Sequence, residues 1–250
     1  MGVSPSIKEG ERYLTNNCGY LTIVRYINAN EIVVRFDDGS ISTSSAGHIR
    51  EGKVWNPNYP NICGVGCFGE GIYSHKTHPK LYSAYRNMLV RCYNDDFKNR
   101  NPTYIDCVVD KRWHNFQNFC ADLSKMVGCE FEDWQLDKDI LFRGNKIYSR
   151  DTCCLVPMDI NTLLVKSDAR RGNLCIGVHY NEKYSKTYLA QCSTSGKIIY
   201  LGCFPSEVEA FFVYKKFKEN EISRRIEVYK DRLDTRVYDI LSKYEVNPDD

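Results

Sequence analysis

The sequence lacks a long apolar run, and it lacks a strong net charge of either sign. No segment approaches the roughly 20 apolar residues that a membrane-spanning helix requires, so we expect no membrane insertion. The first ten residues lack a basic stretch followed by an apolar core, so no signal peptide is predicted. The formal net charge of +2 neither identifies nor excludes a nucleic-acid-binding protein, because local clusters of charge decide such binding.

Cysteine pairs at zinc-binding spacing are also scarce, although the chain has 12 cysteines. Cys63 and Cys67 form one loose pair, Cys153 and Cys154 are adjacent, and the others are scattered. A chain of 250 residues can bury a core without a disulfide framework. We therefore favour reduced thiols, packed as small hydrophobic side chains, over a structural zinc site.

The hydrophobic pattern predicts an α+β protein that begins with a small β domain. Residues 20–24 and 32–36 are rich in β-branched and aromatic side chains, which favours the strands of a small antiparallel barrel or sheet. Residues 56–71 are rich in proline and glycine and are typical of a connector. We therefore predict four parts: a small β-barrel domain (1–72), a ββα domain (73–170), a three-stranded antiparallel sheet with a helix (171–222), and a C-terminal amphipathic helix (223–250).

The middle of the chain has helical periodicity, followed by a strand pair. Apolar residues from Leu81 to Cys92 fall on one helical face, and a second helix is predicted to begin at Trp113. Residues 136–156 predict a hairpin, and a helix is expected after Pro157.

The last third of the chain returns to strands. Three are predicted, at residues 175–180, 187–192 and 198–202, and a helix should begin at Ser206 with Glu209 in a capping box. An apolar stripe from Ile226 to Tyr244 predicts one further amphipathic helix. That helix would dock on the protein's own core or on a second copy, which would make a homodimer.

Three sequence segments in this region carry a resemblance to a known family. They are Ile176-Gly177-Val178, Tyr188-Leu189-Ala190 and the run from Tyr200 to Phe204, followed by a helix with Glu and Ala. The pattern resembles the ethylene-response-factor type of DNA-binding domain, which occurs in plants and in phage endonucleases. The resemblance implies three strands that present one sheet face to the DNA major groove.

The resemblance also implies a set of DNA-contacting positions on the exposed sheet face. Asn and Gln side chains can bond adenine edges, and lysine can neutralise phosphate. The family has an arginine where this chain has His179, so the recognised DNA sequence does not carry over. The alternative is an ordinary solvated sheet face. The matching positions are His179, Asn181, Lys183, Tyr188, Gln191, Ser193, Lys197 and Tyr200.

A second resemblance covers residues 81–165. The segments Leu136-Asp137-Lys138-Asp139, Gly144 to Ser149, Asp151-Thr152-Cys153 and Asn161 resemble the HNH and homing endonucleases of phages. The family implies one divalent metal ion, magnesium or manganese, held here by Asp137 or Asp139. In the same comparison Asp137 and Asn161 take the places of two catalytic-site residues.

The histidine that would act as general base in this family is replaced by Lys138. A free lysine has a pKa of about 10.4, so a base working near pH 7 would need its pKa lowered by roughly 3.4 units, at about 4.6 kcal/mol. Carboxylates at Asp137 and Asp139 would oppose that change. Lys138 is therefore better suited to contact a phosphate, and His114 is the alternative candidate for the base.

The sequence favours a double-stranded DNA-binding protein of the phage HNH-endonuclease type whose catalysis is lost or reduced. One rival is an active, divalent-metal-dependent DNA endonuclease that uses His114. A second rival, motivated by the near-neutral charge, is a phage protein-interaction module that inhibits a host enzyme. The resemblance to phage proteins implies a location in the cytoplasm of a bacterial host.

Overall fold

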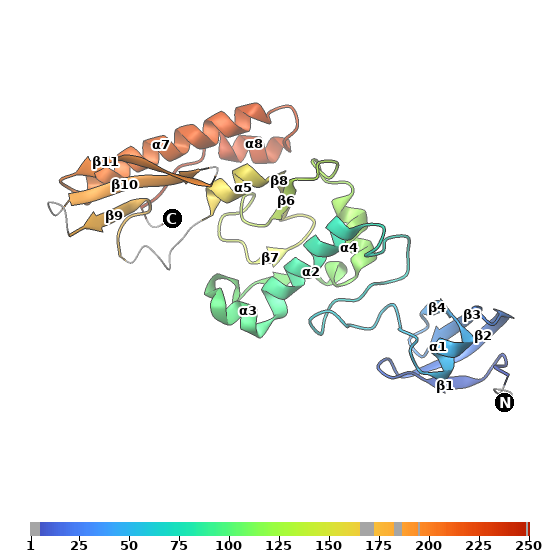
Figure 1. The fold of residues 1–250 in the computed structure, drawn as a ribbon. Helices are drawn as coiled ribbons and strands as arrows, with labels where there is room; N and C mark the ends of the chain where they lie inside the picture. The colour runs from blue at the N-terminus through green and yellow to red at the C-terminus, as the bar shows by residue number, and fades with distance from the viewer. Residues whose placement is uncertain (1–5, 166–172, 183–186, 195, 249) are drawn as a thin grey trace. The chain divides into compact units, whose positions relative to one another are not determined.

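The computed structural model describes residues 6–165, 173–182, 187–194, 196–248 and 250, and it shows a mixed α+β protein (Figure 1). The chain forms two compact units, Met1–Leu123 and Ser124–Asp250. The α+β class was predicted. Within the described ranges, no helix is both long and apolar enough to cross a membrane.

Unit 1 begins with an antiparallel sheet whose strands follow sequence order: β1 (Arg12–Leu14), β2 (Tyr20–Asn28), β3 (Glu31–Phe36) and β4 (Ile41–Ser44). Alternate residues such as Leu21, Ile23 and Val34 point into a core that the short helix α1 (Ala46–Arg50) covers. The predicted sheet is present. Among the described residues no pairing joins β1 to β4, so the closed barrel was not found.

The rest of unit 1 is helical and has an aromatic core. Its elements are α2 (Pro79–Tyr93), α3 (Asp95–Arg100), η1 (Pro102–Tyr104), β5 (Val108–Val109), η2 (Lys111–His114) and α4 (Phe116–Leu123). Tyr85, Trp113 and Phe119 are fully buried, as the helical spacing predicted. The helix predicted from Trp113 begins later, at Phe116, because the Asn115 side chain accepts the Gln117 backbone N–H and separates η2 from α4.

Unit 2 contains the predicted hairpin, helix and three-stranded sheet. Its elements are β6 (Trp134–Asp137), β7 (Ile147–Tyr148), β8 (Cys154–Pro157), α5 (Met158–Leu164), β9 (Val178–Asn181), β10 (Thr187–Thr194), β11 (Lys197–Phe204), α7 (Glu207–Val228) and α8 (Thr235–Leu241). β6 pairs antiparallel with β8, and α5 follows directly. The second sheet is antiparallel in the order β11-β10-β9. Ser206 caps α7 by accepting the Glu209 backbone N–H, as predicted.

The 22-residue helix α7, which runs along the β9–β11 sheet in Figure 1, belongs to two hydrophobic cores. Its first half buries Ala210 and Tyr214 against the β9–β11 sheet. Its second half buries Ile222 and Ile226 against β6, β8, α5 and α8. The boundary predicted at residue 222 therefore falls inside a continuous helix.

The C-terminal stripe packs on the protein's own core, but not as a single helix. Leu233, Val237 and Leu241 are buried in the same core as Ile226. The predicted helix from Ile226 to Tyr244 is wrong, because α7 ends at Val228 and α8 starts at Thr235. Asp234 begins the new helix by accepting the Arg236 backbone N–H.

The 12 cysteines are free thiols. Several are buried, and burial raises the pKa of Cys120 and of Cys153 to about 12. Such thiols stay protonated near neutral pH and pack as apolar groups, as the sequence predicted.

Candidate nucleic-acid interface

The β9–β11 sheet has one covered face and one open face. Val178, Ala190 and Cys192 alternate along their strands and are buried against α7. The residues between them must therefore point to the opposite side. We call that side the outer face of β9–β11.

Five of the predicted DNA-contacting residues lie on this outer face. Cross-strand pairing places His179 opposite Leu189, Asn181 opposite Thr187, Gln191 opposite Tyr200, and Ser193 opposite Ile198. The outer face therefore carries these side chains: His179, Asn181, Thr187, Leu189, Gln191, Ser193, Ile198, Tyr200 and Cys203. None of them is acidic.

A β-bulge positions the centre of the outer face. Ala190 pairs with Gly202 and Gln191 pairs with Tyr200, so Leu201 is an extra residue in β11. The bulge keeps Tyr200 and Cys203 on one face, where the Tyr200 hydroxyl lies 2.9 Å from Cys203 Sγ. This hydrogen bond raises the pKa of Tyr200, so its hydroxyl keeps its proton at neutral pH. Tyr200 is 61% exposed and Ile198 is 68% exposed, which leaves both accessible to a ligand.

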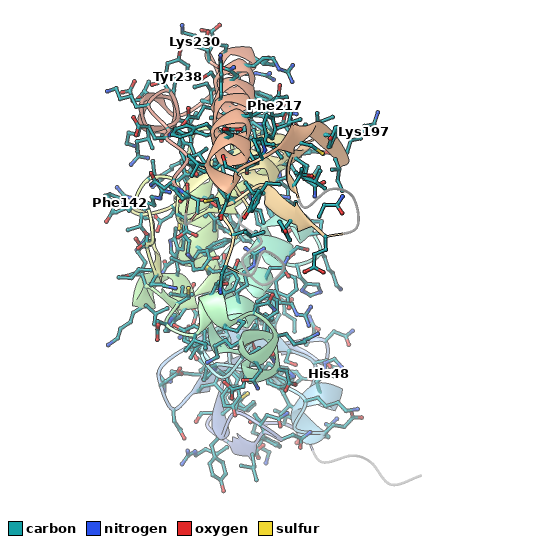
Figure 2. All side chains as sticks on the ribbon, turned by 90° about the vertical axis from the view of Figure 1, so that its left-hand side faces the viewer. His48, Phe142, Lys197, Phe217, Lys230 and Tyr238 are labelled. Carbon is teal, nitrogen blue, oxygen red and sulfur yellow. The ribbon has the colours of Figure 1, made fainter. Side chains whose placement is uncertain are left out.

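The other three predicted DNA-contacting residues do not join this group. Tyr188 shares the covered face with Ala190, and its ring lies 5.2 Å from that of Tyr180. Lys197 lies at the hairpin end of β11, paired with Thr194, and Figure 2 shows it at the edge of the unit with its side chain directed outward. Lys183 lies outside the described residues.

Gly177 fixes the start of β9 under α7. Its φ is +76°, in the left-handed region, and a Cβ atom there would lie 2.1 Å from the Tyr214 ring. Glycine is needed for both reasons, backbone conformation and space. The resemblance included this glycine, and the structure shows its physical role.

The stretch of sequence that includes β9–β11 is basic. Residues 166–204 contain six lysines and arginines against two acidic residues, in a protein whose net charge is only +2, and Lys197 is the one of these six that lies within the described ranges. An open face whose strand residues carry no carboxylate is suited to a polyanion.

Two of the residues predicted to form a nuclease site, Lys138 and Asp139, lie in the loop after β6 and bind each other. Lys138 is buried, and its ammonium group donates to both carboxylate oxygens of Asp139 at 2.7 Å and to the Asn145 carbonyl at 2.8 Å. The Asn145 side-chain amide donates in return to the carbonyls of Lys138 and Ile147. This network closes the loop between β6 and β7.

Asp137 is also occupied by its own backbone. Its Oδ1 accepts the backbone N–H of Asp139 at 2.7 Å and that of Ile140 at 2.8 Å. Burial raises the pKa of Asp137 above its ordinary value in spite of these two bonds. The carboxylate therefore stabilises a turn.

Asn161 and His114 have structural contacts as well. On α5, Asn161 donates to Gln135 Oε1 at 2.8 Å. In unit 1, His114 Nε2 lies 3.1 Å from the Val109 carbonyl and 3.2 Å from the Tyr93 hydroxyl. A carbonyl can only accept, so Nε2 carries the proton and Nδ1 is the basic nitrogen of the neutral ring.

The predicted metal ligands do not form a divalent-cation site in this arrangement. Both oxygens of Asp139 face the Lys138 ammonium, so a metal ion there would have to displace a bonded cation. Across the described ranges, no group of three or more His, Cys, Asp and Glu residues is placed to share a metal ion. The carboxylate oxygens are donors of the type that magnesium and manganese take, but those of Asp139 hold an ammonium group here.

Comparison of the chain with protein-family models, with curated proteins and with solved structures gave no match. Sequence reasoning missed four residues of the outer face, which are Thr187, Leu189, Ile198 and Cys203. Period-two alternation from Gln191 would have found Thr187 and Leu189, and alternation from Tyr200 would have found Ile198, whereas the bulge in β11 hides Cys203 from such a count.

Proposed function

We propose that this protein binds double-stranded DNA through the outer face of β9–β11 and does not cleave it. One observation carries the proposal. His179, Asn181, Gln191, Ser193 and Tyr200 converge on one open sheet face that bears no carboxylate, while α7 buries the other face.

The chemistry of this face suits the major groove, which admits β elements. Asn181 and Gln191 each offer a carbonyl oxygen and an amide group, the pair that bonds the N6 and N7 edge of adenine. Ile198 is apolar and exposed, as a contact to a thymine methyl group requires. Lys197, exposed at the hairpin end, would contact a phosphate beside this face.

The finer fold assignment is part of the same proposal. The β6–β8 pair with α5 would be a ββα unit of the HNH endonuclease lineage, and β9–β11 with α7 would be an ethylene-response-factor-like reader. The protein would act in the cytoplasm of a phage-infected bacterium. Catalysis would be lost because Lys138 and Asp139 neutralise each other within the loop.

A binding experiment tests the outer face directly. Fluorescence anisotropy with a pool of 30-base-pair duplexes at two salt concentrations should show affinity that falls steeply as salt rises. The double variant Gln191→Ala/Tyr200→Ala should bind more weakly and select no preferred sequence from the pool. The matched control Asn220→Ala/Phe212→Ala removes an exposed amide and an exposed aromatic ring from α7 and should bind like the unmodified protein.

Incubation with supercoiled plasmid tests the absence of cleavage. We expect no nicking with magnesium, manganese or a chelator. Metal-dependent nicking that Asp137→Ala abolishes would overturn the proposal in favour of the endonuclease. No salt-sensitive binding to any duplex would overturn it in favour of a protein-interaction module.

A further inference from the structure

The β1–β4 sheet of unit 1 also has one covered and one open face. Leu21, Ile23 and Val34 point into the core under α1. The residues between them form the opposite side, which we call the outer face of β1–β4.

Arginines line this outer face. Arg12, Thr22, Arg35 and Ile41 are consecutive cross-strand partners, so they form one row across all four strands. The neighbouring row contains Arg25, Val33 and Thr43. Figure 1 shows these four strands at the N-terminal end of the chain.

A β-bulge brings the third arginine onto the face. Ile23 pairs with Val34, and the next pair is Arg25 with Val33, so Val24 is an extra residue in β2. Without the bulge, Val24 would face Val33 and Arg25 would point to the core side. With strands about 4.8 Å apart, Arg25 and Arg35 lie within roughly 10 Å of each other.

Two of these arginines have no acidic partner. Arg25 and Arg35 are exposed, and no ion pair involves either one within the described ranges. Arg12 donates to both Asp37 oxygens, at 2.8 and 3.0 Å, and lies 4.8 Å from the centre of the Tyr20 ring. Three further carboxylates lie nearby: Glu9, which accepts the Tyr26 backbone N–H at 2.9 Å, Glu31, at the β2–β3 turn, and Glu70, which accepts the Ile41 backbone N–H.

We propose that the outer face of β1–β4 binds the phosphate backbone of duplex DNA through Arg25 and Arg35. Planar guanidinium groups bind phosphate oxygens in pairs, and two such groups on one rigid sheet act together. Ile41 within the row and Tyr20 beside it add exposed apolar area. These contacts read no base, so this face supplies affinity without sequence preference. The inference rests on the proposed function in that DNA is the shared ligand.

The test compares three double variants of the full chain in the anisotropy experiment. Arg25→Gln/Arg35→Gln should weaken binding to every duplex by about tenfold and reduce the slope of log affinity against log salt by about two. Arg25→Lys/Arg35→Lys keeps both charges and should retain most of that slope. The control Lys125→Gln/Lys243→Gln changes the net charge equally at exposed sites in unit 2 and should leave the slope unchanged.

The outcomes separate this inference from the proposed function. Binding that keeps the unmodified affinity and slope in Arg25→Gln/Arg35→Gln would overturn the inference and leave the β9–β11 interface intact. The variant Gln191→Ala/Tyr200→Ala should keep some salt-sensitive binding. If adding Arg25→Gln/Arg35→Gln to that variant abolishes the remaining binding, the inference is supported. If the control Lys125→Gln/Lys243→Gln loses as much of the salt slope as Arg25→Gln/Arg35→Gln, the inference is also overturned, because net charge alone would then explain the effect.

Discussion

Asp137 accepts two backbone N–H groups, and burial raises its pKa. In the pH range between the ordinary and the raised pKa, the folded state binds more protons than the unfolded state. The free energy of unfolding therefore falls as pH rises through that range, and the cost of burying the charge persists at neutral pH.

Asparagine at this position should therefore preserve the turn. Asp137→Asn keeps an oxygen that can accept both N–H groups and removes the buried charge, so its stability at pH 7 should equal or exceed that of the unmodified protein. Asp137→Ala leaves the two donors without an acceptor and should cost about 1–3 kcal/mol. Urea denaturation at pH 7 measures both. An equal loss of stability in Asp137→Asn and Asp137→Ala would contradict the prediction and show that the turn needs the negative charge.

Lys218 is a second buried titratable residue, on the covered side of β10. It is 7% exposed, lies 6.0 Å from the Tyr214 ring, and burial lowers its pKa. The unfolded state binds more protons between the lowered and the ordinary pKa, so stability should rise with pH through that window. Lys218→Met should add about 1 kcal/mol near pH 7 and remove this alkaline rise. Melting temperatures of both proteins from pH 7 to 10 measure the two effects. A Lys218→Met variant that is less stable than the unmodified protein at pH 7 would contradict the prediction.

At the scale of single residues, the sequence shows which residue types occupy the candidate nuclease site but not which groups they contact. The order Asp137-Lys138-Asp139 and the loss of the expected histidine were visible in the sequence. The hydrogen bond from Lys138 to the Asn145 carbonyl depends on how the loop closes, which residue types alone do not determine.

Among the elements, β9 depends on one glycine, Gly177, where the strand starts. Gly177→Ala should cost about 3 kcal/mol, because a left-handed φ and a clash with Tyr214 add together. Gly144→Ala is the matched control, since its φ is +77° and nothing lies within 4 Å of the added Cβ. It should cost only about 1–2 kcal/mol. Equal shifts in the melting temperature of the two variants would rule out the packing contribution.

Element types were largely predictable, and element boundaries were not. Alternation predicted β2, β3 and the three strands of the second sheet. The bulges in β2 and β11 escaped prediction because an extra residue breaks the period on which such reasoning depends. Tyr188 was assigned to the open face from the resemblance, although alternation with Ala190 puts it on the covered face, where it pairs with Tyr180.

For unit 2 as a whole, Arg225 joins the sheet to the hairpin and helix. It is buried on α7 and donates to Asp159 of α5 at 2.6 Å and to Thr194 of β10 at 2.9 Å. Arg225→Ala should cost about 2 kcal/mol and loosen the coupling between the two cores. Hydrogen exchange measures the free energy of opening of each strand. This free energy should be the same for β10 and β8 in the unmodified protein and should differ between the two strands in Arg225→Ala. Separate values in the unmodified protein would contradict this coupling.

The length of α7 has a practical consequence for protein engineering. As a continuous rod of about 33 Å, it carries part of each core on its surface. A fragment cut at residue 222 would separate Ile226 from the first half of the helix, and the core that Ile226 shares with β6, β8, α5 and α8 would lose the support of the rest of α7. Engineering of the outer face of β9–β11 should therefore substitute side chains on the strands and leave the helix uncut.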